Sequence, residues 1–255
     1  MPDTAQLPFF FLILARITAF FISGPLFSLQ GIPATVKVGL SFLVAVIVFP
    51  LVASDTGPQQ VEGWYYLLAL ARETMVGLVI GYTASLFIAA LVYAGSLIDI
   101  HIGFFMSNMF DPVSGGMITI VSRFMYLLGL VVMLSFNGHH LIISALVKSF
   151  SLVPLNAAQA TGDSAWVLVK TFAQMIGLGV QIAAPVIAVV LIIDVALGLL
   201  ARTAPQINVF MLGFPIKIIA GLVTLGVMAP VLVRIIYSLC DMIESNIMIL
   251  LKGLT

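Results

Sequence analysis

The chain has 255 residues, of which 62% are hydrophobic and 8% are charged, and its ten Lys and Arg balance ten Asp and Glu. A soluble protein of this length carries about a quarter charged residues, so the composition excludes a soluble enzyme, and the charge balance leaves no basic surface for nucleic acid. We therefore predict an all-α membrane-type protein, one helical domain over residues 1–255, whose helices are interrupted at charged and Gly/Pro-rich points.

Six apolar blocks follow one another along the chain. They run from Leu7 to Ile22, Val38 to Ala53, Trp64 to Ile98, Met117 to Phe136, Thr171 to Ile193 and Ile218 to Val233, with a shorter piece from Leu141 to Val153. The third block is uncharged from Met75 to Ile98, after Arg72 and Glu73. The first block contains an arginine and is not followed by a small-residue cleavage site. We therefore expect a retained helix there and not a cleaved signal peptide.

The lengths of these blocks point to helices that other protein supports. A bilayer span needs roughly 17–25 apolar residues, and the second and sixth blocks lie at or below the lower limit. Pro185 and Pro230 fall inside blocks, where they are predicted to kink or break a helix. The lysines and arginines are spread too evenly to set an orientation. These features favour kinked or broken helices packed against other subunits over a simple lipid-facing bundle.

Four small residues recur at every fourth position of the third block, at Gly77, Gly81, Ser85 and Ala89. This spacing places them on one helix face and lets another helix approach closely. We predict tight packing inside the chain, and a contact between subunits is the alternative.

Ionisable residues inside apolar segments are costly and are therefore candidates for function. They are Arg16, Arg72, Glu73, Asp99, Arg123, Asp194 and Arg234. We favour buried, pairwise neutralisation between helices, for example of Asp194 by Arg123 or Arg16, over a direct role in transport.

Enzyme chemistry has no specific support in the sequence. His101, His139 and His140 lack the spacing of a zinc site, and the single cysteine, Cys240, excludes a multi-thiolate metal cluster. No nucleophile elbow and no glycine-rich phosphate loop is present. We therefore expect neither catalysis, nor a metal, nor a cofactor.

The stretch from Gly103 to Gly116, GFFMSNMFDPVSGG, combines adaptable methionines and bulky phenylalanines with a tail that is not expected to stay helical. Such backbone at membrane depth must be buried in protein or line a cavity. From the residues alone we favour core packing over gating.

Near the C-terminus a polar stripe recurs at helical spacing, which predicts an amphipathic helix. Its residues are Arg234, Ser238, Asp241, Ser245 and Lys252.

Three ordered motifs punctuate the chain, namely residues 24–40, GPLFSLQGIPATVKVGL, residues 136–140, FNGHH, and residues 197–217, LGLLARTAPQINVFMLGFPIK. Together they resemble the flagellar biosynthetic protein FliR family. The last, which we term the signature segment, is similar to the family pattern nearly throughout. Block order and length agree as well, so the resemblance covers the chain from about Leu7 to Tyr237.

The resemblance implies a non-enzymatic subunit of the type III export gate in the flagellar basal body of the bacterial inner membrane. It implies helical hairpins like those of FliP and FliQ joined in one chain, assembly with FliP and FliQ into a channel for unfolded protein substrates, and work with FlhA and FlhB.

By position in the resemblance, residues 103–116 are the plug loop that closes the channel, which makes gating the favoured role of this segment. Its sealing and shaping residues are Gly103, Phe104, Phe105, Met106, Asn108, Met109, Phe110 and Asp111. Deleting the loop is predicted to make membranes leak. The implied turns and subunit contacts are Pro25, Pro33, Lys37, Asn137, Gly138, His139, Arg202, Pro205, Gln206, Gly213, Phe214, Pro215 and Lys217.

In one place the sequence departs from the family pattern. Family members often carry Ala-Gly-Glu and then Gln, where this chain has Ser96 and His101, with Asp99 as a nearby acid. The role of that glutamate does not carry over.

Two alternatives to a flagellar export subunit remain open. One is the homologous injectisome subunit, related to the protein SctT, which exports virulence effectors, and the other is a secondary transporter with broken helices. An intramembrane hydrolase has the least support.

Overall fold

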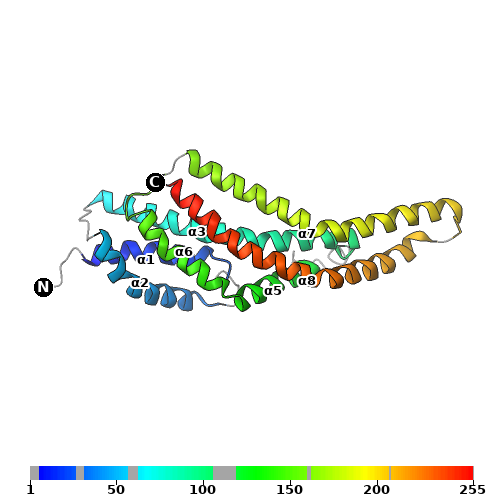
Figure 1. Cartoon of the computed structure of the whole chain (residues 1–255), viewed down its shortest axis with the longest axis horizontal. Coiled ribbons are helices and arrows are strands. Elements are labelled where there is room, and N and C mark those ends of the chain that lie inside the picture. The colour runs from blue at the N-terminus through cyan, green and yellow to red at the C-terminus, as the bar shows by residue number, and fades with distance from the viewer. Residues whose placement is uncertain are drawn as a thin grey trace. The chain divides into compact units, whose positions relative to one another are not determined.

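The structure is a computed structural model that describes residues 6–26, 32–56, 63–105, 119–159, 162–206 and 208–254. These ranges contain helices and no strand, which confirms the all-α prediction. The helices are α1 (Gln6–Ser23), α2 (Ala34–Thr56), α3 (Trp64–Ile102), α5 (Ile120–Ser135), α6 (Gly138–Leu152), α7 (Gly162–Thr203) and α8 (Val209–Lys252), all labelled in Figure 1.

Within the described ranges five helices are long and apolar enough to cross a membrane, namely α1, α2, α3, α7 and α8, and the number becomes six if α5 and α6 form one broken span. Helices α7 and α8 have 42 and 44 residues, far longer than the blocks predicted there. Pro185 and Pro230 lie inside these continuous helices, so neither proline breaks its helix.

The chain divides into two compact units. Unit 1 comprises residues 1–87, 136–172 and 239–255, and unit 2 comprises residues 88–135 and 173–238. Helices α3, α7 and α8 each contribute one part to either unit. The assignment of residues 1–255 to a single domain stays a prediction.

In unit 1, α1 packs against α2, and Figure 1 shows these two helices side by side. Their contact is aromatic, since the ring of Phe9 meets that of Phe49 and the ring of Phe10 meets that of Phe42, in both pairs edge to face. Such geometry adds to the gain from burying the apolar surface. Both aromatic pairs stabilise the α1–α2 contact.

Gly77 and Gly81, two members of the predicted small-residue face of α3, pack inside unit 1. A Cβ on Gly77 would overlap the carbonyl oxygen of Arg16 and lie 2.9 Å from the Cβ of Ala19, and one on Gly81 would lie 2.8 Å from the carbonyl oxygen of Phe20. Two glycines therefore bring α3 into backbone contact with α1. This confirms internal packing for these two positions.

Gly77→Ala is expected to destabilise the purified chain by about 1–3 kcal/mol, because the added methyl overpacks the contact with α1. Gly177→Ala is the matched control, since that helical glycine has open space around its Cα and alanine is the better helix former. Thermal unfolding in detergent measures both. Equal stability of the two variants would contradict the backbone contact.

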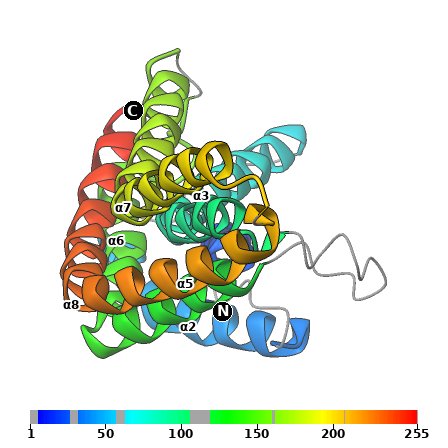
Figure 2. The same ribbon diagram turned by 90° about the vertical axis from the view of Figure 1, so that its right-hand side faces the viewer.

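In unit 2, α7 and α8 form a helical hairpin joined by residues 204–208, which Figure 2 shows facing the viewer. Asn208 starts the second arm, because its side-chain oxygen accepts the backbone N–H of Met211 at 3.3 Å, as an N-cap does. On α8, Gly221 lies against the side chain of Ile102 at the end of α3. The hairpin therefore packs on the second part of α3.

Much apolar surface remains uncovered in the single chain. In the most apolar 18-residue stretch of each helix, 22% of the residues are buried in α2 and in α7, and 17% are buried in α8. In α3 the buried share of this stretch is 61%. Three of the five candidate spans therefore need cover from lipid or from other subunits. At the end of α8 the predicted polar stripe is confirmed, since Arg234, Ser238, Asp241, Ser245 and Lys252 are all exposed.

Candidate functional site

A buried ion pair joins α1 to α3 in unit 1. The Nε of Arg16 lies 2.6 Å from Oε2 of Glu73, and both side chains are fully buried. The Nη1 of Arg16 donates to the backbone oxygen and hydroxyl of Ser149 on α6, at 3.1 and 3.3 Å, and its guanidinium carbon lies 4.5 Å from the ring centroid of Phe150. A charge buried this deeply is tolerated only when it is paired and hydrogen-bonded. The pair therefore fixes three helices of unit 1.

Glu73 also holds the turn after α6. Its Oε1 accepts the backbone N–H of Asn156 at 2.8 Å, and Asn156 has a left-handed backbone with φ 66°. Asparagine tolerates this conformation better than most residues. The Glu73 carboxylate therefore pairs with the buried guanidinium of Arg16 and also accepts the backbone N–H of the turn at Asn156.

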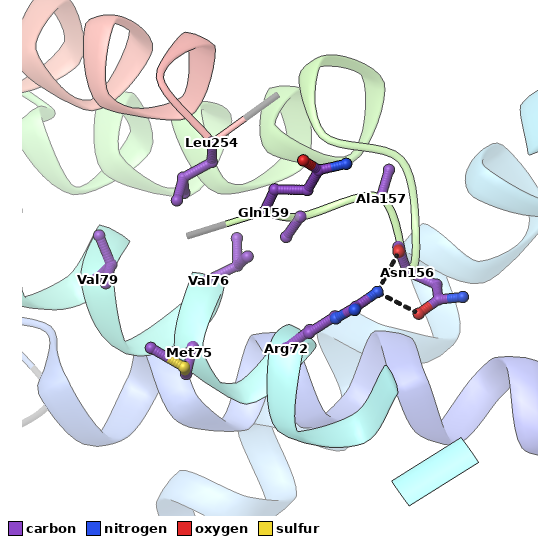
Figure 3. Close-up of a pocket in the computed structure, with 9 residues that line it drawn as sticks. Arg72, Met75, Val76, Val79, Asn156, Ala157, Gln159 and Leu254 are labelled. Carbon is purple, nitrogen blue, oxygen red and sulfur yellow. Dashed lines mark hydrogen bonds between the residues drawn. The ribbon is translucent and has the colours of Figure 1, made fainter. Parts of the chain in front are cut away.

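Beside this turn lies a cavity of about 640 Å³ within unit 1. Figure 3 shows Arg72 pointing at Asn156, and Nη1 of Arg72 donates to the backbone and side-chain oxygens of Asn156 at 3.3 and 3.4 Å. The other lining residues are Met75, Val76, Val79, Ala157, Ala158, Gln159 and Leu254. The cavity is mostly apolar, with its polar groups gathered at the turn.

The remaining predicted charges are less buried than expected. Arg72 and Arg123 are exposed, and Asp194 is half-buried, so in the single chain the prediction of burial is wrong for these three. Asp194 pairs with Lys217 in unit 2 and not with Arg123 or Arg16, the partners expected from sequence. Arg72 hydrogen-bonds to Asn156, and the guanidinium carbon of Arg123 lies 5.8 Å from the ring centroid of Tyr126.

Asp99, in unit 2, is the third fully buried charge of the described residues, and it caps α5. Its carboxylate accepts the hydroxyl of Thr119 and the backbone N–H groups of Val121 and Ser122, the latter two at 3.0–3.2 Å. Acceptors at these positions satisfy the free N–H groups of a helix start. Among the described residues Asp99 forms no ion pair, so the partial positive charge of the helix N-terminus offsets its charge.

The predicted plug loop lies only partly within the described residues. Gly103 ends α3 with φ +103° and packs against the ring of Phe214, Phe104 is half-buried, and Phe105 is exposed. Five of the predicted residues lie outside the described ranges, namely Met106, Asn108, Met109, Phe110 and Asp111.

The signature segment lines a notch of about 320 Å³ between the arms of the α7–α8 hairpin. Gly213, Phe214 and Lys217 face Asp194 and Leu197 across it. Arg202, Pro205 and Gln206 are exposed at the end of α7 and in the following turn.

The expectation that residues 213–217 form a turn is wrong. Gly213, Phe214, Pro215 and Lys217 lie within α8, because the cap at Asn208 starts a helix that continues past the proline.

The other motif residues are distributed over unit 1. Pro25 is buried just after α1, and Pro33 is exposed directly before α2. Asn137, with φ 57°, precedes the buried Gly138 at the start of α6. The rings of His139 and His140 lie 4.2 Å apart between centroids and are tilted by 38° to each other. The backbone oxygen of Lys37 accepts the hydroxyl of Ser41 at 2.7 Å. These residues stand at helix ends, and the structure does not bring them together into one site.

The comparisons with known proteins agree with the motifs. A family model described as "Bacterial export proteins, family 1" matches residues 7–243. The chain is 37% identical over 249 residues to the flagellar biosynthetic protein FliR of Bacillus subtilis (strain 168), covering 95% of each chain. It is 33% identical to FliR of Pectobacterium carotovorum subsp. carotovorum, covering 88% of this chain and 85% of the relative. It is 29% identical to FliR of Escherichia coli (strain K12), covering 96% and 92%. Since the similarity extends over nearly the whole length of both partners, the chain belongs to the FliR family of bacterial export proteins.

Proposed function

We propose that this chain is a membrane-embedded, non-enzymatic subunit of the flagellar type III protein export apparatus. The observation that carries the proposal is the near-full-length similarity to flagellar biosynthetic proteins, up to 37% identity over 95% of the chain. In this role the chain lies in the bacterial inner membrane, within the flagellar basal body. It contributes to a path for unfolded protein substrates and performs no chemical step itself.

The uncovered helix faces support assembly with other subunits. Helices α2, α7 and α8 bury only about a fifth of their most apolar windows, and the exposed residues there include Ile47, Ile192 and Val227, each with at least 70% of its surface accessible. Surfaces of this kind mark interfaces with protein or lipid. The proposed partners are FliP-like and FliQ-like proteins in the channel, with FlhA-like and FlhB-like proteins beside it.

We assign the plug of this channel to residues 103–116. The described end of the segment carries Phe104 and the exposed Phe105 directly after a helix stop at Gly103. Bulky aromatic and methionine side chains can seal a narrow pore and still deform as a substrate passes. The notch of the signature segment, with Asp194 and Lys217, is the proposed contact with a neighbouring subunit.

Deleting the chain's gene is expected to abolish secretion of flagellar filament protein, and a plasmid copy should restore it. Immunoblots of culture medium measure export, and affinity purification of a tagged copy from membranes should recover the FliP-like and FliQ-like proteins. Normal secretion in the deletion strain would contradict the export function. Purification of the chain free of both partners, from cells that export normally, would contradict the assembly.

A further inference from the structure

Asp99 takes part in hydrogen bonds both at the end of α3 and at the start of α5. The backbone oxygen of Asp99 accepts the N–H of Gly103 at 3.0 Å, where α3 ends. Its side chain accepts the hydroxyl of Thr119 and the N–H groups of Val121 and Ser122, where α5 begins. The end of α3 therefore lies about one helical turn, roughly 6 Å along the axis of α3, after the residue that caps α5.

Two neighbouring positions on α3 bring the same two helices together. A Cβ on Gly95, one turn before Asp99, would lie 2.7 Å from the backbone nitrogen of Ser122 and 3.0 Å from the carbonyl carbon of Val121. The hydroxyl of Ser96 lies 2.9 Å from that of Ser122. Backbone contact at Gly95 thus places the first turn of α5 where the carboxylate of Asp99 can cap it. We call Gly95, Ser96, Asp99, Thr119, Val121 and Ser122 the α3–α5 junction.

We propose that Asp99 is the positioning residue of the plug, because it holds the end of α3 at Gly103 and the start of α5 at Thr119 together through the α3–α5 junction. The inference rests on the proposed function in one respect, namely that this segment seals the channel. The carboxylate acts through backbone groups and does not itself need to touch the exported protein. Thr119 alone could serve as an ordinary N-cap, yet its hydroxyl donates to Asp99, so the helix start depends on a residue of another helix.

The first measurement tests the anchor without any channel. In the full-length chain, Asp99→Asn keeps the size of the side chain and removes its charge, and Asp99→Ala removes the acceptors. Backbone hydrogen exchange at Val121 and Ser122 is expected to become about tenfold faster or more in Asp99→Ala, because hydrogen bonds to a charged acceptor are lost. Asp99→Asn should lie between this variant and the native chain. Unchanged exchange in both variants would overturn the inference.

The second measurement tests positioning in the assembled complex with its FliP-like and FliQ-like partners. Reconstituted into dye-loaded vesicles, complexes with Asp99→Ala or Gly95→Val are expected to leak several-fold faster than the native complex at equal amounts of complex. Asp241→Asn, an exposed aspartate on α8, is the matched control and should not leak. A purely structural role would lower the yield of complex and leave the leak per complex unchanged, which would overturn the inference.

A complex lacking residues 103–116 separates this inference from the proposed function. If the loop deletion leaks and Asp99→Ala does not, the anchor is wrong and the plug stands. If the loop deletion itself does not leak, the plug assignment is wrong, and hydrogen exchange still decides whether Asp99 holds the α3–α5 junction. If Asp99→Ala does not assemble, Asp99→Asn carries the same comparison.

Discussion

Replacing Glu73 by alanine is expected to destabilise the chain by about 3–5 kcal/mol, the usual cost of removing one partner of a buried ion pair. The change leaves the guanidinium of Arg16 buried without its carboxylate, and it leaves the backbone N–H of Asn156 without its acceptor. Both losses fall on the contacts that join α1, α3 and the turn after α6. Unfolding of the purified chain in detergent, followed by circular dichroism, measures the effect.

The exposed ion pair in the same unit provides the control. Lys148 and Glu244 lie 2.8 Å apart with side chains that are 53% and 30% exposed, and such pairs contribute about 0–1 kcal/mol. Glu244→Ala should therefore be nearly neutral. A double variant, Arg16→Met with Glu73→Met, should recover part of the loss, because it removes both charges together. A Glu73→Ala variant as stable as Glu244→Ala would show that the buried pair does not hold unit 1.

Removing the proposed plug loop is expected to have the largest effect on the permeability of the membrane. A complex without residues 103–116 should pass ions and small dyes many-fold faster than the native complex, because no apolar side chains remain to exclude water from the path. Vesicle dye release or the conductance of a planar bilayer measures this. Unchanged permeability at equal amounts of complex would contradict the plug.

A variant of unchanged length distinguishes the seal from the mere presence of the loop. It carries serine in place of five apolar residues, Phe104, Phe105, Met106, Met109 and Phe110. If hydrophobic closure is the mechanism, this variant should leak nearly as much as the deletion. If only the bulk of the loop matters, it should stay closed. Serine at Phe124, an exposed position on α5, serves as the control for loss of an aromatic ring.

Which charges are buried could be predicted from the sequence only in part. A charge in an apolar helix is costly wherever it lies, so the sequence indicates Arg16, Glu73 and Asp99 as candidates for burial. It does not indicate their partners, because Arg16 and Glu73 are 57 positions apart and only the packing of α1 on α3 brings them together. Arg72, adjacent to Glu73 on α3, points to a different side of the helix and remains exposed, although both side chains hydrogen-bond to Asn156.

Helix ends were the weaker part of the prediction. The apolar blocks stopped at charges, yet Asp194 and Lys217 neutralise each other across the hairpin, so α7 and α8 continue through them. The apolar blocks alone do not predict the cap at Asn208, although an asparagine before an apolar run is a signal of a helix start. The capping of α5 by Asp99 has no local pattern at all, since donor and acceptor belong to different helices.

The distance along the chain between Arg16 and Glu73 also bears on how the protein is made. Chains grow at roughly 5–20 residues per second, so α1 emerges about 3–11 s before the carboxylate that neutralises its arginine. An arginine alone in the centre of a membrane helix costs about 2.5–3.5 kcal/mol on insertion scales. Helix α1 is therefore expected to insert poorly into the bilayer by itself. Packing against α3, whose Glu73 pairs with Arg16, stabilises it there, so we expect the first third of the chain to insert as one unit.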